Sequence, residues 1–312
     1  MNTITHEPVM IEEAIEALNI RKNFLYVDAT FGLGGYAKKI LKTEGCSLLA
    51  IDRDPDVVKF SEELKKFYKS RFKFILGTFG NLKTILEDEQ LKTVTGGIVA
   101  DLGMSNLQLE DNKRGFSIKN SGPLDMRMSK TGLSADYVVN FFQENELSNI
   151  FWKYGEEYKS RKIAKKIVTE RKKKRISTTH DLANLVKKAK PHKIPYRIHP
   201  ATKTFQALRI FINNELDEIK NFISGSISLL APGARLVLIT FHSLEDRLVK
   251  TTFNKLCNTN QPINRHLPST YQENKPKFRK VGKSFYFPTH KEVTKNAKAR
   301  SAKLRVIERI SF

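Results

Sequence analysis

The first third of the sequence carries glycines and an acidic residue in an order that suits a bound nucleotide-like cofactor. Residues 28–36 read DATFGLGGY, with Gly32, Gly34 and Gly35 between a strand-like and a helix-like segment. Glycine lets the backbone turn tightly there and approach a ligand closely. Asp52 ends the next strand-like segment, where a carboxylate can accept hydrogen bonds from both ribose hydroxyls. We therefore expect a cofactor loop at residues 28–36, with Asp52 as its ribose ligand.

A second acidic residue, Asp101, closes a later strand-like segment. Open α/β sheets place their ligands at the carboxyl ends of the strands, so Asp101 belongs to the same candidate site. The pattern Gly32-x-Gly34-x-x-Ala37 also satisfies the loose dinucleotide fingerprint. These residues alone do not separate a nicotinamide-dependent dehydrogenase from an S-adenosylmethionine enzyme.

The segments that must position these residues alternate between strand and helix patterns. Helix-length segments separate successive apolar strands, which predicts right-handed crossovers and a mostly parallel sheet of the α/β class. The expected strands are residues 24–28, 47–52, 72–76, 96–101 and 234–240, with two last strands at 284–287 and 303–307. Helices are expected at residues 36–43, 55–67 and 244–256, and residues 258–282 read as a polar loop.

The alternation stops between about residues 112 and 202, where the patterns are helical and no convincing strand occurs. An apolar stripe predicts a helix that the run RKKKR, residues 171–175, ends. Its members are Ile163, Ala164, Ile167 and Val168. Ser177 and the threonines after it are candidate caps for a helix over residues 181–190. Apolar residues from 205 to 219 have the spacing of one long helix face. We expect a core of residues 1–111 and 203–312 with an inserted helical domain over 112–202.

The charge of the chain is concentrated in two segments. The net charge is +22, which is too lopsided for an ordinary metabolic enzyme and indicates a polyanionic partner, either nucleic acid or an acidic membrane surface. Residues 153–203 hold 17 Lys and Arg against 4 Asp and Glu, and residues 247–312 hold 16 against 3. The rest of the chain is therefore net −4. Two basic segments suit a long nucleic-acid track, since each phosphate contact releases counterions.

Several other classes of protein are disfavoured. Cys46 and Cys257 have no metal-ligand spacing, and the seven histidines include no HExxH pair, so we expect no disulfide framework and no metal site. No apolar run reaches transmembrane length. The N-terminal segment, from Met1 to Glu13, lacks the features of a signal or transit peptide. These observations predict a soluble cytoplasmic protein.

Longer motifs favour one of the two cofactor classes. They read DLGMSNLQ (101–108), RGFS (114–117), GPLDMRM (122–128), HPATKTFQALR (199–209), FHSLEDR (241–247) and ARSAKLR (299–305). In this order, from about His6 to Arg309, they resemble the bacterial 16S ribosomal RNA cytosine-N4 methyltransferase family (RsmH/MraW). The resemblance implies a Rossmann-like class I methyltransferase with helices on both sheet faces and an inserted substrate-recognition domain. It also implies S-adenosylmethionine as methyl donor.

The resemblance further implies N4 of a decoding-centre (P-site) cytidine in 16S rRNA as methyl acceptor, within the 30S subunit or a late precursor. No DNA or membrane partner is expected. The family's cofactor positions fall here on Gly34, Gly35, Tyr36, Asp52, Phe79, Asp101 and Gln108. The family usually has histidine where Tyr36 stands, and it usually has SSPQ where residues 105–108 read SNLQ. Asn106 and Leu107 are therefore expected to alter the loop near the methyl group.

The chemistry of an amine acceptor makes demands of its own. The cytosine N4 lone pair is delocalised, so the enzyme must align the amine with the methyl group and accept hydrogen bonds from it. The familiar Asn/Asp-Pro-Pro-Tyr signature is absent, and Asp101-Leu-Gly stands at the equivalent strand end. Asp125 and His242 are the candidate catalytic residues. Asp125 could instead be a cap or an arginine partner, and His242 a structural histidine.

Substrate handling is expected to fall to cationic side chains, because arginine forks and lysine charges suit phosphates. The candidates are Arg114, Arg127, Lys172, Lys173, Lys174, His199, Arg209 and Arg247. A target base in structured RNA is splayed out and often stacked on an aromatic ring. Phe116 and Trp152 are candidate platforms, although a place in the core is the favoured interpretation of Trp152.

The cysteines favour methylation of an amine over methylation of a ring carbon. Transfer to cytosine C5 normally needs a thiolate that adds to C6, and neither Cys46 nor Cys257 lies on the expected substrate side. Two other functions remain as alternatives. One is a nicotinamide-dependent oxidoreductase, and the other is a non-catalytic RNA-binding ribosome-assembly factor that kept the fold.

Overall fold

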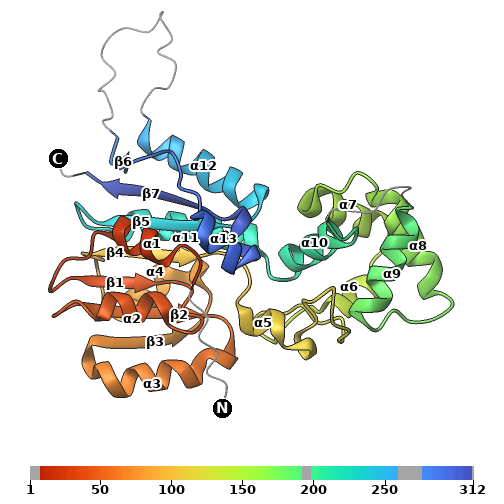
Figure 1. The fold of residues 1–312 in the computed structure, drawn as a ribbon, viewed down its shortest axis with the longest axis horizontal. Helices are drawn as coiled ribbons and strands as arrows, with labels where there is room; N and C mark the ends of the chain where they lie inside the picture. Colours follow the sequence, from red (N-terminus) through yellow and green to blue (C-terminus); the bar gives the residue numbers. More distant parts are fainter. Residues whose placement is uncertain (1–7, 192–197, 259–275, 311–312) are drawn as a thin grey trace, which may run out of the picture. The chain divides into compact units, whose positions relative to one another are not determined.

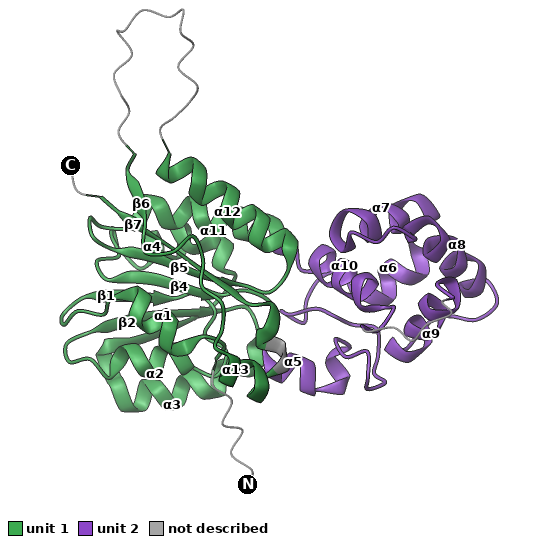
Figure 2. Ribbon diagram, turned by 45° about the horizontal axis from the view of Figure 1, so that its top comes forward, with its two compact units in different colours: residues 1–103, 216–312 green, residues 104–215 purple. Residues whose placement is uncertain are grey.

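The computed structural model of the protein describes residues 8–191, 198–258 and 276–310. These residues form two compact units, one of residues 1–103 and 216–312 and one of residues 104–215 (Figure 2). No helix in the described ranges has the length and apolar character needed to cross a bilayer.

The first unit is built on a seven-stranded sheet in the order β3-β2-β1-β4-β5-β7-β6 (Figure 1). The strands are β1 Leu25–Asp28, β2 Ser47–Asp52, β3 Phe72–Leu76, β4 Gly97–Asp101, β5 Arg235–Thr240, β6 Phe278–Lys280 and β7 Lys303–Arg309. Neighbouring strands from β3 to β5 pair in parallel, and β7 is antiparallel to both β5 and β6. This order confirms the predicted α/β, Rossmann-like class.

Helices cover both faces of the sheet (Figure 2). They are α1 Ile11–Leu18, α2 Gly35–Leu41, α3 Val58–Tyr68, α4 Leu82–Asp88, α11 Glu215–Leu229, α12 Ser243–Cys257 and α13 His290–Lys295. Helices α4, α11 and α12 pack on one face, in a core that includes Val27, Ile98 and Phe222. The strands are buried on both sides, as parallel strands require, and this explains their continuous apolar runs.

The C-terminal part of the sheet differs from the prediction. Residues 284–287 form no strand and contribute only an isolated bridge from Tyr286 to Leu304. Strand β6 lies instead at residues 278–280, inside the expected loop. Gly282, with φ +65°, turns the chain between the two segments, and Pro288 cannot donate to a ladder. The rest of that loop, residues 259–275, lies outside the described residues.

The second unit is helical, and its described residues contain no strand. Its helices are α5 Asn106–Glu110, α6 Ala135–Phe141, α7 Glu144–Gly155, α8 Ser160–Arg171, α9 Thr179–Ala189 and α10 Thr202–Ile212. Ile163, Ala164 and Ile167 are buried, as the stripe predicted. Thr178 caps α9 through a capping box with Asp181.

This unit is longer at both ends than the expected insert, 112–202. It begins at residue 104, because Met104 and Leu109 pack against its core. It ends at residue 215, because Phe205, Ala207 and Leu208 of α10 are buried in that core.

The single helix expected over residues 205–219 is two helices. The chain breaks at Asn213 and Asn214, and Asn214 takes the left-handed conformation that asparagine tolerates, with φ +52°. The buried Asn213 amide donates to the carbonyls of Met126 and Arg209 and accepts from the Met128 amide, at 2.8–2.9 Å. Asn213 therefore fixes the loop before α6 to the end of α10.

We predict that Asn213→Ala destabilises the protein strongly. The change leaves buried backbone groups of Met126 and Met128 without a partner, and each such group costs about 1–3 kcal/mol. Urea unfolding monitored by circular dichroism measures the effect. Asn214→Gly is the matched control, since glycine accepts a positive φ freely and Asn214 is exposed. Equal unfolding midpoints for wild type and Asn213→Ala would refute the assigned role.

Candidate active site

Three acidic residues close three adjacent strands of the sheet. Asp28 ends β1, Asp52 ends β2 and Asp101 ends β4. Strand β1 pairs in parallel with both β2 and β4, so the three carboxylates lie at one edge of the sheet. This is the edge at which open α/β sheets bind their ligands.

The glycine loop holds the Asp52 carboxylate in place. The Gly32 amide donates to Asp52 Oδ2 at 2.8 Å, and the Asp54 amide donates to Oδ1 at 2.9 Å. Each oxygen keeps a further lone pair that can accept from a ligand hydroxyl. Burial raises the pKa of Asp52 to about 6 despite these two donors. The Asp52 carboxylate is therefore held in one orientation, and its two hydrogen bonds replace only part of the solvation that burial removes.

Gly34 is required by the shape of this loop. It precedes α2 with φ +75°, a left-handed conformation that favours glycine. A Cβ at this position would lie 2.9 Å from the ring of Phe31. The next residue, Gly35, would bring a Cβ to 2.2 Å from the ring of Pro8. Both glycines predicted to bind cofactor are thus also needed for the close packing of the loop.

Asp28 and Asp101 are carboxyl groups buried in the interior without full hydrogen-bond compensation. The Asp28 Oδ2 and Asp101 Oδ1 atoms are buried and have no hydrogen-bond partner within the described structure. Burial raises the pKa of Asp28 to about 7. Burial, together with the charges of Asp28 and Glu245, raises the pKa of Asp101 well above its ordinary value. Two unsatisfied acceptors at a ligand-binding edge fit a positively charged ligand.

The side chain of Tyr36 anchors the N-terminal segment and does not act as a ligand-binding group. Its buried hydroxyl donates to the carbonyl of Val9 at 2.6 Å. The next residue, Met10, donates its amide to Glu292 Oε1 at 2.7 Å. A contact between Tyr36 and cofactor would therefore run through its backbone, as the replacement of the usual histidine suggests.

Phe79 lies at the carboxyl end of β3, in a short 3-10 turn. Its ring packs edge-on against Phe222, with the centroids 5.2 Å apart. The following amide, on Gly80, donates to Glu218 Oε2 at 3.0 Å. Core packing thus fixes the position of the Phe79 backbone at the same edge of the sheet.

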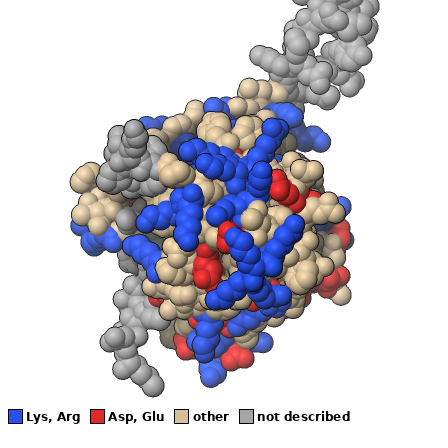
Figure 3. Space-filling view, turned by 90° about the vertical axis from the view of Figure 1, so that its right-hand side faces the viewer, with Lys and Arg blue, Asp and Glu red and all other residues tan. Residues whose placement is uncertain are grey.

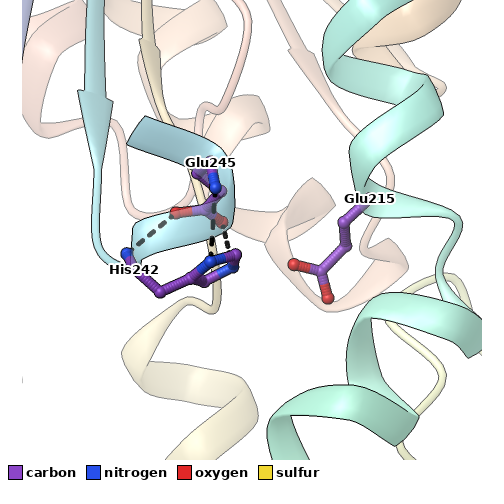
Figure 4. Close-up of side chains that lie close together, drawn as sticks. All are labelled: Glu215, His242 and Glu245. Carbon is purple, nitrogen blue, oxygen red and sulfur yellow. Dashed lines mark hydrogen bonds and ion pairs between the residues drawn. The ribbon is translucent and has the colours of Figure 1, made fainter. Parts of the chain in front are cut away.

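His242 is the N-cap residue of α12, two residues after the end of β5. Its Nδ1 accepts from the Glu245 amide at 3.3 Å, and its Nε2 lies 3.0 Å from Glu245 Oε1 (Figure 4). Glu245 is fully buried, and its Oε2 accepts from the amides of Phe241 and His242. The ring is therefore held tightly by the capping box of its own helix. Glu215, also drawn in Figure 4, ion-pairs with Arg209.

The motif that contains His242 is tied to the C-terminal motif. Asp246 on α12 accepts from Arg305 at 2.7 Å and from Lys303 at 2.8 Å, both on β7. Burial alone would raise the pKa of Asp246, but the hydrogen bonds and charges of these two cations hold it below its ordinary value. This pairing fixes α12 against the antiparallel strand.

The motifs of the helical unit contact one another in the same way. Arg114 is 5% exposed and donates to the carbonyls of Arg127 and Met128 at 3.0 and 2.7 Å. The Asp125 carboxylate accepts hydrogen bonds from Nε and Nη2 of Arg127, at 3.0 and 2.7 Å. It also accepts from the Arg127 amide at 2.9 Å. Burial opposes ionisation of Asp125, but Arg127 lowers its pKa below the ordinary value. Asp125 is therefore a weak base.

Two further predicted residues are also held by neighbours. Arg209 is 9% exposed and forms a two-pronged ion pair with Glu215 at 2.7 Å. The Gln108 side chain accepts from the Ser105 amide at 3.1 Å and completes the capping box of α5. Leu107, which replaces the usual proline, therefore leaves the start of α5 capped.

Comparison with known proteins identifies the class. The model of the MraW methylase family matches residues 3–310. The chain belongs to the MraW methylase family. A protein of Rickettsia bellii called ribosomal RNA small subunit methyltransferase H is 44% identical over 98% of this chain and 99% of its own length. Proteins of the same name from Ehrlichia canis and Parvibaculum lavamentivorans are 42% and 43% identical, over 98% and 97% of this chain and 100% and 89% of their own.

The methyl donor of this enzyme is S-adenosylmethionine, and the residues at the sheet edge fit it. The donor is cationic at its sulfur and at its amino group, and Asp28 and Asp101 offer buried, unsatisfied carboxylate oxygens. Its ribose needs an oriented acceptor, which Asp52 provides. Its methyl group is electrophilic and supplies the chemistry of transfer.

Four of the residues predicted to touch RNA are held by contacts inside the helical unit. Arg114 and Arg209 are both buried. Arg114 donates to backbone carbonyls and Arg209 pairs with Glu215, so neither guanidinium is available to a phosphate. Phe116 is 5% exposed and belongs to the core of the helical unit, so it offers no free face. Arg127 is partly exposed but bound to Asp125.

Other predicted residues lie at the surface. Lys172, Lys173 and Lys174 are exposed, although Lys173 pairs with Glu170 at 3.3 Å. His199 and Arg247 are exposed too. Trp152, expected in the core, is 56% exposed.

Asp28 and Glu245 were not predicted as site residues, although Asp28 opens the expected cofactor loop. Asp28 follows the same rule as Asp52 and Asp101, because an acidic residue closes its strand, and that signal could have found it. Glu245 was hidden within the FHSLEDR motif, and its burial depends on the packing of α12, which no local pattern reveals.

We predict that Asp28→Asn stabilises the cofactor-free enzyme, increasingly as the pH rises. Folding raises the Asp28 pKa from an ordinary 3.8 to about 7, so the wild type loses stability as the pH rises between these values. Each unit of raised pKa corresponds to about 1.4 kcal/mol. Melting temperatures measured from pH 4 to pH 8 should diverge up to about pH 7 and then run parallel.

The variant Asp88→Asn, at an exposed position, supplies the control for loss of one surface carboxylate. Melting curves of wild type and Asp28→Asn that keep a constant separation across the whole pH range would show that Asp28 is compensated in solution.

Proposed function

We propose that this protein transfers the methyl group of S-adenosylmethionine to the N4 amine of a decoding-centre cytidine in 16S rRNA. The substrate is the 30S subunit or a late precursor of it, in the cytoplasm. The observation that carries the proposal is the match, over nearly the whole of each chain, to relatives named ribosomal RNA small subunit methyltransferase H.

The placement of the cysteines supports an amine as acceptor. Cys46 precedes β2, at the opposite end of that strand from Asp52, and its buried thiol donates to the Arg21 carbonyl at 3.1 Å. Cys257 ends α12, ~21 Å along the helix from its first residue. Burial raises the pKa of both thiols. Neither is a thiolate poised at the ligand-binding edge, which ring-carbon methylation would need.

The two units divide the work of binding. The sheet unit holds the predicted cofactor residues other than Gln108, and the helical unit carries much of the positive charge. Residues 104–215 contain 23 Lys and Arg against 11 Asp and Glu. Figure 3 shows Lys and Arg spread over a face on which Asp and Glu are fewer. Lys172, Lys173 and Lys174 at the end of α8 are the most concentrated of these charges.

Three side chains are candidates to accept the hydrogen bond of the amine. Asp125 has a lowered pKa and is hydrogen-bonded to the Arg127 guanidinium, and both observations favour a positioning role for Asp125. His242 sits at the carboxyl end of β5, with its ring held by Glu245. Asp101 ends the neighbouring strand, and its Oδ1 has no partner in the described part of the chain. We therefore assign acceptance of the amine hydrogen bond to Asp101 at the end of β4, with His242 at the start of α12 as a positioning residue, because its Nδ1 already accepts from the Glu245 amide.

The two alternative functions predict different ligands. A nicotinamide-dependent oxidoreductase would bind NADH and not S-adenosylmethionine. A non-catalytic assembly factor would bind 30S subunits without methylating them. Calorimetry with both cofactors, and methyl transfer from labelled donor to 30S subunits, separate all three.

We predict that wild type forms N4-methylcytidine in 30S subunits incubated with S-adenosylmethionine. Chromatography and fragmentation of the nucleosides distinguish this product from 5-methylcytidine. The double variant Cys46→Ala, Cys257→Ala should keep most of the transfer rate, because no covalent enzyme–base intermediate forms. A folded double variant without activity would overturn the N4 assignment.

We also predict different losses for the three candidate acceptor residues. Asp101→Asn should lower kcat by roughly 10²–10⁴-fold, because it removes the carboxylate that accepts the amine hydrogen bond, and His242→Gln should lower it less. Asp125→Asn keeps one carbonyl acceptor for Arg127 and should cost far less. Single-turnover rates at saturating cofactor, with the cofactor Kd measured separately, test this order. A loss in Asp125→Asn equal to that in Asp101→Asn would restore Asp125 as the acceptor.

A further inference from the structure

The exposed aromatic pair Trp152 and Tyr158 is an unexplained feature of the helical unit. Trp152 lies near the end of α7 and is 56% exposed, while Tyr158 lies between α7 and α8 and is 83% exposed. Their rings meet edge-on, with centroids 6.0 Å apart and planes at 74°. Single exposed aromatics are ordinary, but two large rings that contact each other at the surface form a shaped apolar feature.

One cation contacts this pair, and others are close to it in sequence. Lys203 Nζ lies 5.3 Å from the Tyr158 ring centroid and donates to the Glu156 carbonyl at 3.0 Å, so it covers one face of that ring. Lys153, Lys159 and Arg161 are exposed next to the rings in sequence. The acidic Glu157 does not offset this charge at the surface, because it is buried and ion-paired with Lys190 at 2.6 Å.

Aromatic faces bordered by lysines and arginines match one kind of ligand in particular. Single-stranded nucleic acid presents unstacked bases to the rings and phosphates to the cations. A protein partner would need acidic groups at the same spacing to meet these cations. The edge-on geometry, with Tyr158 covered by Lys203, leaves the indole of Trp152 as the face for a base.

We propose that Trp152, with Tyr158 as its side wall and Lys203 fixing that wall, is a stacking platform for an unpaired nucleotide of the RNA substrate. The platform holds RNA that flanks the target and takes no part in methyl transfer. This inference rests on the proposed function, since it assumes that the substrate is RNA with single-stranded segments.

Trp152 is the only tryptophan of the chain, so its fluorescence reports on this position alone. We expect a single-stranded oligocytidylate of about 12 nucleotides to quench the emission as it binds. Trp152→Ala should weaken binding of this RNA by about 5- to 150-fold, the range typical of one lost stacking contact. Trp152→Phe should recover part of the affinity, because a smaller ring still stacks.

Two controls separate stacking from charge and from general exposure. The triple variant Lys172→Ala, Lys173→Ala, Lys174→Ala should flatten the dependence of log Kd on log salt, whereas Trp152→Ala should leave that slope as it is. Phe67→Ala removes another exposed ring, 79% exposed and edge-on to Tyr68 beside Arg71, from α3 of the sheet unit. It should bind RNA like wild type.

The outcomes that overturn the platform are specific. Saturation with RNA without any change in emission would do so, and so would equal RNA affinity of wild type and Trp152→Ala. Loss of 30S binding in Trp152→Ala with unchanged oligocytidylate binding would assign the rings to a ribosomal protein instead. Wild type that methylates no rRNA would reject the proposed function, and the fluorescence titration would still decide the platform.

Discussion

The structure depends on carboxyl groups that the sheet buries in its interior without a matching cation. Asp28, Asp52 and Asp101 stand on adjacent strands, and burial raises the pKa of each of them. The surrounding loop relieves only part of the cost of burial, through the Gly32 amide and the amides of Thr30 and Asp54. A cationic ligand relieves the remainder, and its binding energy is then also folding energy. The tight glycine loop, the anchored N-terminal segment and the buried Glu245 all surround these carboxylates.

Most of the sheet could be predicted because its determinants are local. Apolar runs of strand length, each closed by an acidic residue or a turn, place β1 to β5 within one residue of their observed bounds. The same rule placed Asp52 and Asp101 at the ligand-binding edge. This rule failed where residues distant in the sequence determine the structure. Strand β6, for example, forms because it pairs with β7. The break between α10 and α11 likewise depends on the Met126 carbonyl, which lies far from Asn213 in the sequence.

For the arginines, residue type alone did not predict which group the side chain binds. Arg114 and Arg209 lie in motifs suited to phosphate recognition, and each instead satisfies buried acceptors within the helical unit. A guanidinium fits a carboxylate or two carbonyls as well as it fits a phosphate, so sequence cannot separate the two uses. Trp152 shows the opposite error, because an aromatic on a helix usually faces the core. The exposure of the lysines could be predicted more directly, since a run such as Lys172 to Lys174 is not buried in a folded protein.

The insertion of the helical unit within the sequence of the sheet unit also affects folding during synthesis. Strands β4 and β5 are neighbours in the sheet, yet the whole helical unit and α11 lie between them in the sequence. A ribosome that adds about 5–20 residues per second needs roughly 7–27 s to deliver β5 after β4. During that interval the edge of β4 is unpaired while the helical unit emerges. That unit has its own core, so it can fold before the sheet that encloses it in sequence is complete.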